Sequence, residues 1–336
     1  MRNVIKKKMS AGFCTALLLA LFAALTGCGS SDEQRYAWPL ATASPEDTVT
    51  QIFAEKFAQE VSERSGGKMK IQVYANSTLG GDRELLETCA DGDIPFVVQN
   101  TAPQVTFMPD LAVFDLPCVF DSLETCRKKV DDERFYGLIS DVYTQGGYHL
   151  LGMADQGFRV MSTNKAVSGA SDFKGQKIRT MENSFHLEFW KALSANPTPM
   201  SFSEVYIGLQ QNTIDAQENP YEVIVSNRLY EQQDYVVETN HLPHLISLIV
   251  NDEFFENLSD EEQEIMMAAA RTATDYAREA SDARIAERVA TIEASGTTIV
   301  TLSDETREEI RERAKPVYES IRAVIDRDIY EAYTGR

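Results

Sequence analysis

The sequence contains few cysteines and none of the short motifs that mark the common classes of enzyme. Its 336 residues include five cysteines, and it has no CxxC pair, phosphate-binding loop, serine nucleophile elbow or dinucleotide fingerprint. His241 and His244 are two of only four histidines, and the proline between them disfavours a helix. No third ligand accompanies them. The sequence therefore predicts neither a metal site nor a cofactor.

Cysteines are also too few for a disulfide framework. Cys89, Cys118 and Cys126 follow the N-terminal region, and three cysteines cannot all pair within one chain. We expect them to be small, buried apolar residues. A disulfide between Cys118 and Cys126 is the less favoured alternative.

Positive charge is scarce as well. The chain has 32 Lys and Arg against 52 Asp and Glu, a net charge of −20. Such a surface repels phosphate backbones and anionic lipids, which argues against nucleic acid and against electrostatic membrane binding. With so many acids, any two could be taken for a glycosidase pair, so their number says nothing about catalysis. A surface-anchored polysaccharide hydrolase remains the alternative from the enzyme class.

An apolar run near the N-terminus indicates export. Residues 1–27 combine a basic start with the run from Ala16 to Leu25, which is the order of a signal peptide and too short for a comfortable membrane span. The end of this segment, Leu-Thr-Gly-Cys, resembles the lipobox of bacterial lipoproteins, which implies cleavage before Cys28 and its acylation. We expect a lipid-anchored extracytoplasmic protein with a flexible tether at residues 28–35. An ordinary signal peptide is the alternative.

Helical and strand patterns alternate through the rest of the chain. Apolar residues recur at helical spacing over residues 51–65, residues 69–77 alternate as a strand, and a second helix is expected over 82–90. Removal of 27 residues leaves 309, enough for two domains. It also removes four cations and no acid, so the mature net charge is −24. The alternation predicts the α/β class.

The second half of the chain continues this alternation and ends in helices. Residues 148–165 are predicted to form a strand, a turn and a second strand. Ser259 and Glu262 form a capping box at the start of a helical pattern that runs to about residue 295. At 1.5 Å per residue, this helix spans on the order of 50 Å, so we expect it to cross two lobes. Shorter elements are expected at 177–180, 184–194 and 241–251.

The stretch SFSEVYIGLQQNTIDAQENP, residues 201–220, places polar side chains at the exit of a predicted strand. Ser201 and Glu204 have the spacing of a capping box before a short helix, which Asn212 can end in a left-handed conformation. A brief strand follows, and the residue before Pro220 is biased toward an extended backbone. In open α/β sheets the carboxyl ends of strands line the ligand crevice. The cluster of Gln217, Glu218 and Asn219 therefore has two interpretations: these side chains contact a ligand, or they form a plain polar surface loop.

Several segments together resemble one family. From about residue 36 to 330 the chain is similar to the extracytoplasmic solute receptors of tripartite ATP-independent periplasmic (TRAP) transporters, of the dicarboxylate receptor type. The matching segments are ANSTLGGDRELLETCADGDIPF, LAVFDLPCVF, GFRVMSTNKAV, DFKGQKIRT and, above all, ANPTPMSFSEVYIGLQQNTIDAQENP. The resemblance implies a receptor that delivers an organic acid anion to a membrane permease without catalysis. An ABC-type solute receptor is the alternative, and the long late helix argues against it.

The resemblance also implies a fold. It is a two-lobe α/β fold of the periplasmic binding protein kind, with hinge strands and a long helix across both lobes. The cleft between the lobes closes on the ligand. Lobe I is expected to contain residues 36–156 and 244–283, and lobe II residues 157–243 and 284–330.

Individual residues acquire roles in the same way. Arg179 in KIRT matches the arginine that pairs with the substrate carboxylate, and a guanidinium has the parallel donors that fit a carboxylate. Arg159 in GFR matches a second arginine near the hinge, which reaches the ligand or supports the site. Asn219 matches an amide donor, and Phe202 an aromatic ring that packs over the bound molecule. A structural salt bridge for Arg179 and core packing for Phe202 are the alternatives.

Three more side chains bear on which acid is bound. Asn100 lies where some sialic acid receptors of the family carry a glutamate, which argues against sialic acid. Glu182 can accept hydrogen bonds from hydroxyls or be an exposed loop acid. Ser44 lies in the loop at 41–47 that approaches the cleft, or is only a turn residue. Because Asn100, Glu182 and Asn219 favour hydroxyls, we expect a sugar acid such as a uronate first and a C4-dicarboxylate second.

Cys28→Ser is expected to release the protein from the membrane and to leave ligand affinity unchanged, because the tether carries no part of the cleft. Cell fractionation followed by calorimetry on the soluble protein measures both effects. A variant that stays in the membrane fraction contradicts acylation at Cys28. A soluble variant without affinity contradicts the boundary at residue 36.

Overall fold

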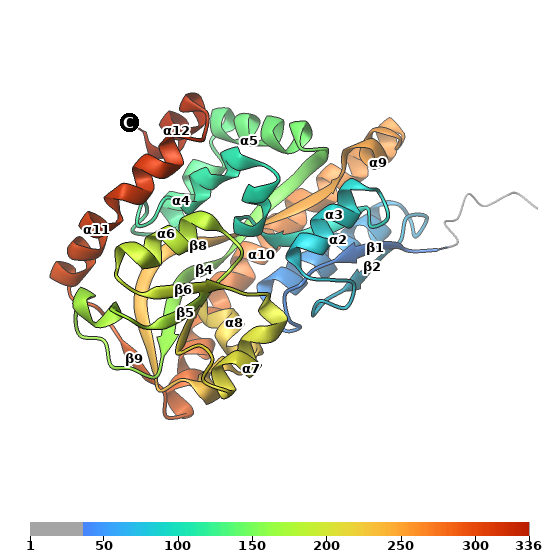
Figure 1. Cartoon of the computed structure of the whole chain (residues 1–336). Helices are drawn as coiled ribbons and strands as arrows, with labels where there is room; N and C mark the ends of the chain where they lie inside the picture. The colour runs from blue at the N-terminus through green and yellow to red at the C-terminus, as the bar shows by residue number, and fades with distance from the viewer. Residues whose placement is uncertain (1–35, 336) are drawn as a thin grey trace, which may run out of the picture.

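The computed structural model describes residues 36–335 and shows one mixed sheet flanked by helices (Figure 1). The strand order is β2-β1-β3-β8-β4-β7-β5-β6, and β9 pairs with β8 outside this order. The predicted signal peptide, the predicted acylation site Cys28 and the predicted tether at 28–35 lie outside the described residues. The α/β class predicted from the alternating patterns is confirmed.

One half of the sheet, here called lobe I, is built on parallel strands. β1 (Trp38–Ala41) runs parallel to β2 (Ile71–Tyr74) and to β3 (Phe96–Asn100). β3 then pairs antiparallel with β8 (Tyr235–Asn251), whose partner along most of its length is β4 (Tyr148–Thr163). The strands β4 and β8 are long enough to leave lobe I and continue into the other half.

The other half, here called lobe II, repeats this arrangement at the far ends of the same two strands. β7 (Ala216–Asn219) pairs antiparallel with β4, and β5 (Lys177–Thr180) runs parallel to β7 and to β6 (Asn196–Pro199). β9 (Thr298–Val300) runs parallel to the start of β8. The carboxyl ends of β1 and β3 therefore face those of β5 and β7 across the middle of the molecule.

The middle of β4 is irregular, and the prediction of two strands separated by a turn over 148–165 is wrong. The strand is continuous and takes up extra residues in register shifts, one of them between Asp155 and Phe158. Gly157 within this bulge has a φ of +91°, which glycine adopts without strain. Directly after this bulge, Phe158 pairs with Pro243 of β8, and proline is tolerated in strands at such irregular positions. The crossing between the lobes is thus made of bent strands.

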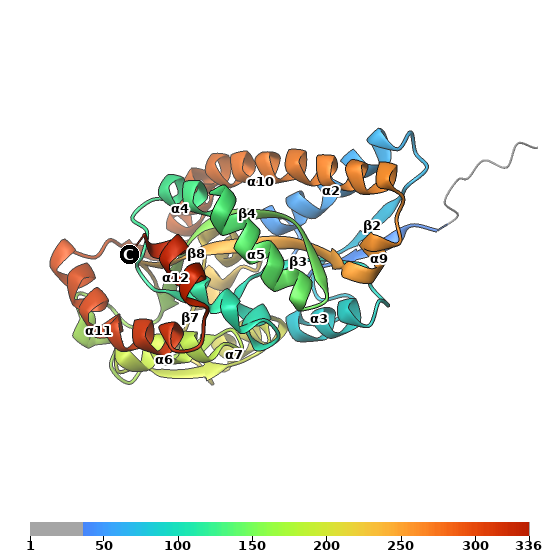
Figure 2. The same ribbon diagram turned by 90° about the horizontal axis from the view of Figure 1, so that it is seen from above.

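Helices cover both faces of the sheet (Figure 2). On one face α2 (Val49–Arg64) packs beside the long helix α10 (Asp260–Ala294), and both share an apolar cluster with alternate residues of β3 and β8. On the other face α3 (Asp82–Ala90) and α5 (Glu133–Gln145) join a second cluster with the intervening residues. This alternation is what a sheet buried on both faces requires.

Except for α11, the remaining helices are shorter than α2, α5 and α10. They are α4 (Leu123–Val130), α6 (Ser184–Ala192), α7 (Val205–Gln210), α8 (Tyr221–Ser226), α9 (Asp252–Glu256), α11 (Asp304–Arg322) and α12 (Arg327–Thr334). Five 3-10 turns complete the described chain: η1 (Ala102–Thr106), η2 (Pro109–Asp115), η3 (Ala170–Phe173), η4 (Phe202–Glu204) and η5 (Leu229–Gln232). α11 packs on α6, and α12 packs on α5.

The long helix predicted from residue 259 to 295 is confirmed. Ser259 and Glu262 form the expected capping box. The buried face of α10 is mostly alanine, with Ala269, Ala270 and Ala273 completely buried, so the helix approaches β4 and α2 closely. Its later turns contact α8 and β9 in lobe II, so α10 connects both lobes.

Three local predictions have different outcomes. The capping box at Ser201 is wrong, because Ser201 Oγ lies 3.3 Å from Ser203 Oγ and a 3-10 turn precedes the helix. Asn212 is left-handed, with a φ of 56°, as predicted. Cys118 and Cys126 are free thiols, which agrees with the preferred interpretation over a disulfide.

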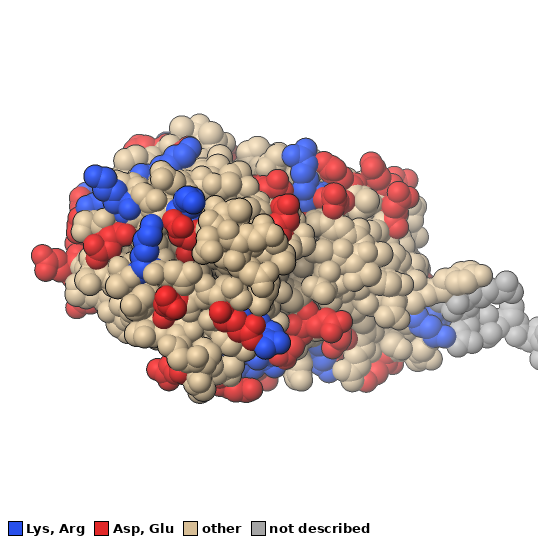
Figure 3. Space-filling view, turned by 60° about the horizontal axis from the view of Figure 1, so that its bottom comes forward, with Lys and Arg blue, Asp and Glu red and all other residues tan. Residues whose placement is uncertain are grey.

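On the face shown in Figure 3, the charged side chains lie mostly toward the periphery and the middle is largely uncharged. Within residues 36–335, no helix is both long and apolar enough to cross a membrane. The same part of the chain has no group of three or more His, Cys, Asp or Glu placed to hold a metal ion.

Gly152→Ala is expected to lower the free energy of unfolding by about 1–3 kcal/mol, because overpacking forces neighbouring atoms apart. A Cβ atom at Gly152 of β4 would lie 2.5 Å from Thr274 Oγ1 on α10. The matched control is Gly169→Ala, where an added Cβ meets nothing within 4 Å. Urea unfolding of both variants measures the difference. Equal stability in both would contradict a tight contact between β4 and α10.

Candidate functional site

A pocket lies between the lobes at the carboxyl ends of the strands. Its volume is about 390 Å³, including the open space at its mouth. Lobe I contributes residues after β1, at the start of α3 and at the end of β3, and lobe II contributes residues after β5, at the end of β7 and on α8. The lining residues are Ala43, Ser44, Pro45, Asp82, Asn100, Arg179, Met181, Phe202, Asn219, Val223 and His244.

Arg179 is held rigidly at the end of β5 and keeps one nitrogen free. Its Nε and Nη2 donate to the carbonyl oxygen of Met200 at 2.9 and 2.7 Å. The guanidinium carbon lies 5.8 Å from the centre of the Phe202 ring, within reach of a cation–π contact. Nη1 is buried without a hydrogen-bond partner. Burial lowers the pKa of Arg179 to about 10, so the group is a desolvated cation at neutral pH.

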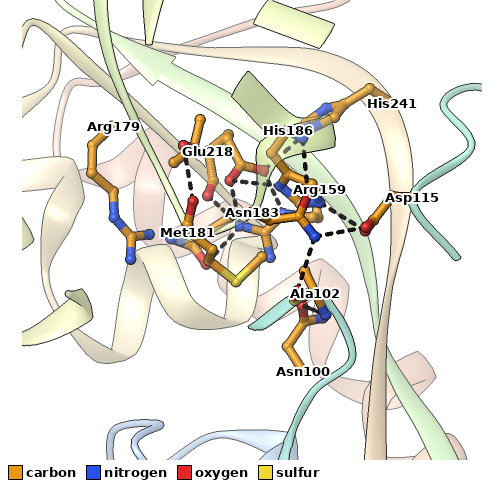
Figure 4. Close-up of polar contacts among 12 residues, drawn as sticks. Asn100, Ala102, Asp115, Arg159, Arg179, Met181, Asn183, His186, Glu218 and His241 are labelled. Atoms are coloured by element: carbon orange, nitrogen blue, oxygen red, sulfur yellow. Dashed lines mark hydrogen bonds and ion pairs between the residues drawn. The ribbon is translucent and has the colours of Figure 1, made fainter. Parts of the chain in front are cut away.

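Arg159, by contrast, is fully engaged within the protein (Figure 4). The side chain is 1% exposed and forms an ion pair with Glu218, which is completely buried. Arg159 Nη2 donates to Glu218 Oε1 at 2.7 Å and to the Glu218 carbonyl oxygen at 2.6 Å. Burial would raise the pKa of Glu218, but the charge of Arg159 and the neighbouring rings of His186 and His241 hold it well below its usual range. The pair belongs to the floor behind the pocket.

Two histidines complete this floor and are neutral. Burial lowers the pKa of both His241 and His244. Arg159 Nη1 contacts His244 Nδ1, and because arginine only donates, the proton of His244 must lie on Nε2. His241 Nε2 lies 3.1 Å from Glu218 Oε2, so it donates there while Nδ1 accepts from Thr239. His244 can therefore offer the pocket an N–H donor.

Asp82 is the acidic counterpart of Arg179 in the pocket wall. It is the first residue of α3, where a carboxylate is favoured by the helix dipole. Burial raises the pKa of Asp82 to about 6, against the opposing effect of Arg179. The carboxyl group is therefore mostly ionised at neutral pH and can accept hydrogen bonds from hydroxyls or pair with a cation.

The structure brings together five of the seven residues that the sequence predicted as ligand-binding. Ser44, Asn100, Arg179, Phe202 and Asn219 all line the pocket. Asn100 and Asn219 are themselves positioned by protein partners. The Asn100 amide donates to the Leu245 carbonyl oxygen at 2.7 Å, and the Asn219 amide donates to Gln217 Oε1 at 2.6 Å. Each Nδ2 atom retains a second N–H group.

The other two predicted residues lie elsewhere. Arg159 is behind the pocket, with its nitrogens paired as described. Glu182 is exposed and outside the lining, although its charge is near enough to contribute to the raised pKa of Asp82. Asp82 and His244 were missed as ligand-facing residues. The GGDRELL segment marks Asp82 only as a helix start, and His244 sits in an apolar strand pattern, so neither pattern indicates a pocket.

Comparison with known proteins identifies the kind of site. Residues 40–323 match the family model described as bacterial extracellular solute-binding protein, family 7. The chain is 31% identical over 309 residues to the ectoine-binding periplasmic protein TeaA of Halomonas elongata, covering 91% of this chain and 89% of that protein.

Solved structures of similar proteins share the whole fold. One is the sugar acid binding protein DctPAm of Advenella mimigardefordensis in complex with galactonate, with a TM-score of 0.86, 29% identity, and coverage of 90% of this chain and 98% of that one. Another is a TRAP periplasmic solute binding protein of Sulfitobacter sp. NAS-14.1 with bound β-D-galacturonate, with a TM-score of 0.85, 26% identity, and coverage of 90% and 100%. The predicted two-lobe fold is thereby confirmed.

Glu218→Gln is expected to lower the free energy of unfolding by about 3–5 kcal/mol, because it leaves the Arg159 charge buried without its partner. The control is Glu124→Gln, which removes an exposed pair with Lys128 and should change the free energy of unfolding little. Urea unfolding at pH 7 compares them. A loss as small in Glu218→Gln as in the control would mean that the buried pair contributes no more than a surface contact.

Proposed function

This chain belongs to the bacterial extracellular solute-binding proteins of family 7, and we propose that it captures a hydroxylated organic acid for a TRAP transporter. The anion binds in the pocket between the lobes, the lobes close over it, and the receptor passes it unchanged to the membrane permease. Family members and structural relatives of this chain are solute-binding receptors. The proposal therefore assigns no catalytic step to the pocket.

The observation that carries the proposal is the free Nη1 of Arg179. A guanidinium whose other nitrogens are fixed on a carbonyl oxygen, and whose position is braced by an aromatic ring, is preorganised for one more charged acceptor. A carboxylate meets this requirement best, because charge-assisted hydrogen bonds are the strongest in a desolvated site. The ligand carboxylate is accordingly assigned to Arg179.

The rest of the lining favours hydroxyl groups over a second carboxylate. Arg159 is neutralised by Glu218, which leaves Arg179 as the pocket's cation for binding an anion. A second carboxylate would also face the negative charge of Asp82. Hydroxyls, in contrast, can donate to Asp82 and accept from the second N–H groups of Asn100 and Asn219. We therefore rank a sugar acid such as a uronate above a C4-dicarboxylate as the ligand. Arg159 is assigned to the support of the site and not to ligand contact.

A zwitterion is the second candidate ligand. Arg179 and Asp82 carry opposite charges on facing walls of one pocket, and Phe202 adds an aromatic face for a cation. The similarity to an ectoine-binding protein supports this candidate, and the similarity to galactonate-binding and galacturonate-binding proteins supports the first. Thermal shift with galactonate, galacturonate, succinate and ectoine separates the two, since binding to the folded state raises the melting temperature.

Lobe motion and membrane delivery belong to the same proposal. The bends of β4 and β8 near Gly157 and Pro243 are assigned to the hinge, with the lobe boundaries at 156/157 and 243/244. A ligand that contacts both lobes stabilises the closed form by its differential affinity. Acylation at Cys28 would keep the receptor beside the permease, outside the cytoplasm.

Arg179→Ala is expected to weaken binding of the best acid by about 30-fold or more, because the ligand carboxylate loses its desolvated partner. Arg159→Ala is expected to weaken binding less and to destabilise the fold more, because it unpairs Glu218. Calorimetry gives the affinities and urea unfolding the stabilities.

The control for Arg179→Ala is Arg327→Ala, an exposed arginine that pairs only with Glu331 within its own helix. It should bind as the unmodified protein does. Equal small losses of affinity in Arg179→Ala and Arg327→Ala would mean that Arg179 has a structural role. Failure of all four ligands to shift the melting temperature would count against an organic acid of this class.

A further inference from the structure

Behind the pocket, the two lobes touch through a small group of buried polar side chains (Figure 4). Asp115, the last residue of η2 in lobe I, accepts hydrogen bonds from Asn183 and His186 of lobe II. The Asn183 Nδ2–Asp115 Oδ2 distance is 2.7 Å, and the His186 Nε2–Asp115 Oδ1 distance is 3.0 Å. Each of the three residues is at most 4% exposed. The contact therefore exists only while the lobes are together.

This contact is tied to the pocket on both sides. Asn183 caps α6 with its Oδ1, which accepts from the backbone N–H groups of Phe185 and His186, so its Nδ2 is directed at lobe I. There it donates to the Ala102 carbonyl oxygen at 2.9 Å as well as to Asp115. The Ala102 N–H in turn donates to Asn100 Oδ1 at 3.0 Å, and Asn100 lines the pocket.

The geometry around the His186 ring defines its protonation. Nε2 faces the carboxylate of Asp115, and Nδ1 lies 3.9 Å from Glu218 Oε1 with no hydrogen-bond partner. A neutral ring would turn a nitrogen lone pair toward one of these carboxylates, which is repulsive. Only the doubly protonated ring presents an N–H group to both.

The charges of the group balance only with that proton. Arg159 and a protonated His186 are the two cations, and Glu218 and Asp115 are the two anions. His241 and His244 are neutral, because burial lowers their pKa. A neutral His186 would leave one buried carboxylate uncompensated, at a cost of several kcal/mol.

We propose that ligand capture by this receptor takes up one proton, which binds to His186 as Asp115 meets it on closure of the lobes. The proposal rests on the receptor function proposed above and adds its regulation. In the open form His186 loses its nearest carboxylate, and near neutral pH its ring is mostly neutral. On closure a buffer acid gives up a proton and the N–H bond forms on the ring. His186, Asp115 and Asn183 are positioning residues, and none of them lines the pocket.

The direction of the pH dependence follows. Burial alone would lower the pKa of His186, but the carboxylates of Asp115 and Glu218 outweigh it and raise the pKa to about 9. An ordinary histidine has a pKa of about 6.5. The proton's contribution to the closed form is therefore complete below about pH 6.5 and is lost as the pH rises through about 9.

Other groups near the ring do not change this sign. Arg159 on β4 and His241 and His244 on β8 lie on the Glu218 side, and burial lowers the pKa of both of these histidines. α11, which covers α6 from outside, contributes apolar residues such as Ile310, Ala314 and Val317 to the core there. Asp82 titrates near pH 6, below the window from about 7 to 9 in which His186 is tested.

A disulfide that holds the lobes closed allows the protonation of His186 to be measured without any ligand. A Cβ atom at Gly81 would lie 3.5 Å from Ser201 Oγ, so Gly81→Cys with Ser201→Cys should lock the lobes closed on oxidation. Cys28→Ser and Cys118→Ser remove competing thiols. Ring NMR then follows the four histidines, with His186 assigned by the signal lost in His186→Asn. We expect its midpoint near pH 9 in the oxidised protein and at least about one unit lower after reduction.

An equal midpoint in the oxidised and reduced proteins, or a neutral His186 ring at pH 7 in the oxidised protein, overturns the proposal. If His186→Asn fails to fold, Asp115→Asn replaces it. In that variant the oxidised midpoint should fall to about the value of the reduced protein, because the facing carboxylate is gone. A midpoint unchanged by Asp115→Asn also overturns the proposal.

Calorimetry with the best of the four ligands tests the link to binding. Titrations at pH 8 in phosphate and in Tris, whose ionisation heats differ, should give an uptake close to one proton per ligand. Affinity should fall about five- to tenfold per unit from pH 7 to 9, and Asp115→Asn should flatten this profile. Tight binding without proton uptake overturns the proposal. No binding by any ligand, with the NMR shift present, overturns the receptor function and leaves proton-linked closure standing.

Discussion

The ion pair between Arg159 and Glu218 is the interaction on which the other polar contacts of the site depend. Both side chains are almost completely buried, so each charge needs the other to offset the loss of water. Glu218 then orients His241, and Arg159 sets the tautomer of His244. Arg159 and Glu218 neutralise each other. Of the two arginines at the site, only Arg179 therefore has a nitrogen without a hydrogen-bond partner, to which an anion can bind. The residues behind the pocket therefore carry no net charge, whereas Arg179 and Asp82 in its wall are charged.

The same pair also fixes β7 of lobe II to β4, one of the two strands that cross between the lobes. Arg159 lies on β4 in the irregular stretch where the strand passes from lobe I to lobe II, and Glu218 lies on β7 beside it. α10 adds a second connection, with small residues that let it lie close to β4. The proposed closure thus moves two rigid halves about a few bent residues.

Electrostatics acts differently outside and inside the molecule. The exterior carries an excess of acids that keeps the protein soluble and repels anions at long range. Inside the pocket, a desolvated guanidinium attracts an anion at short range, where the local dielectric is low and the interaction strong. In the proposed function, selection among acids is assigned to Asp82, Asn100 and Asn219, which line the pocket and whose acceptors and donors must all be matched. Unmatched groups in a buried site carry a free-energy penalty, which is the basis of specificity here.

The sequence by itself determined the α/β class, the approximate bounds of the helices α2, α3, α6 and α10, and the residues that approach the pocket from strand ends. Periodicity and caps are local, so α3 and α10 could be predicted almost to the residue. It did not determine that residues 148–163 form one bent strand, because a bulge and a turn use the same glycine and polar residues. The local pattern did not separate the roles of Arg159 and Arg179, since both are arginines on apolar strands, and the family resemblance left Arg159 either as a ligand contact or as a support of the site. Only the tertiary structure decided that Glu218, 59 residues from Arg159, neutralises one of them and leaves the other free. Pairing at such sequence separation has no local signal, because the partners are chosen by the way the strands are arranged in the sheet.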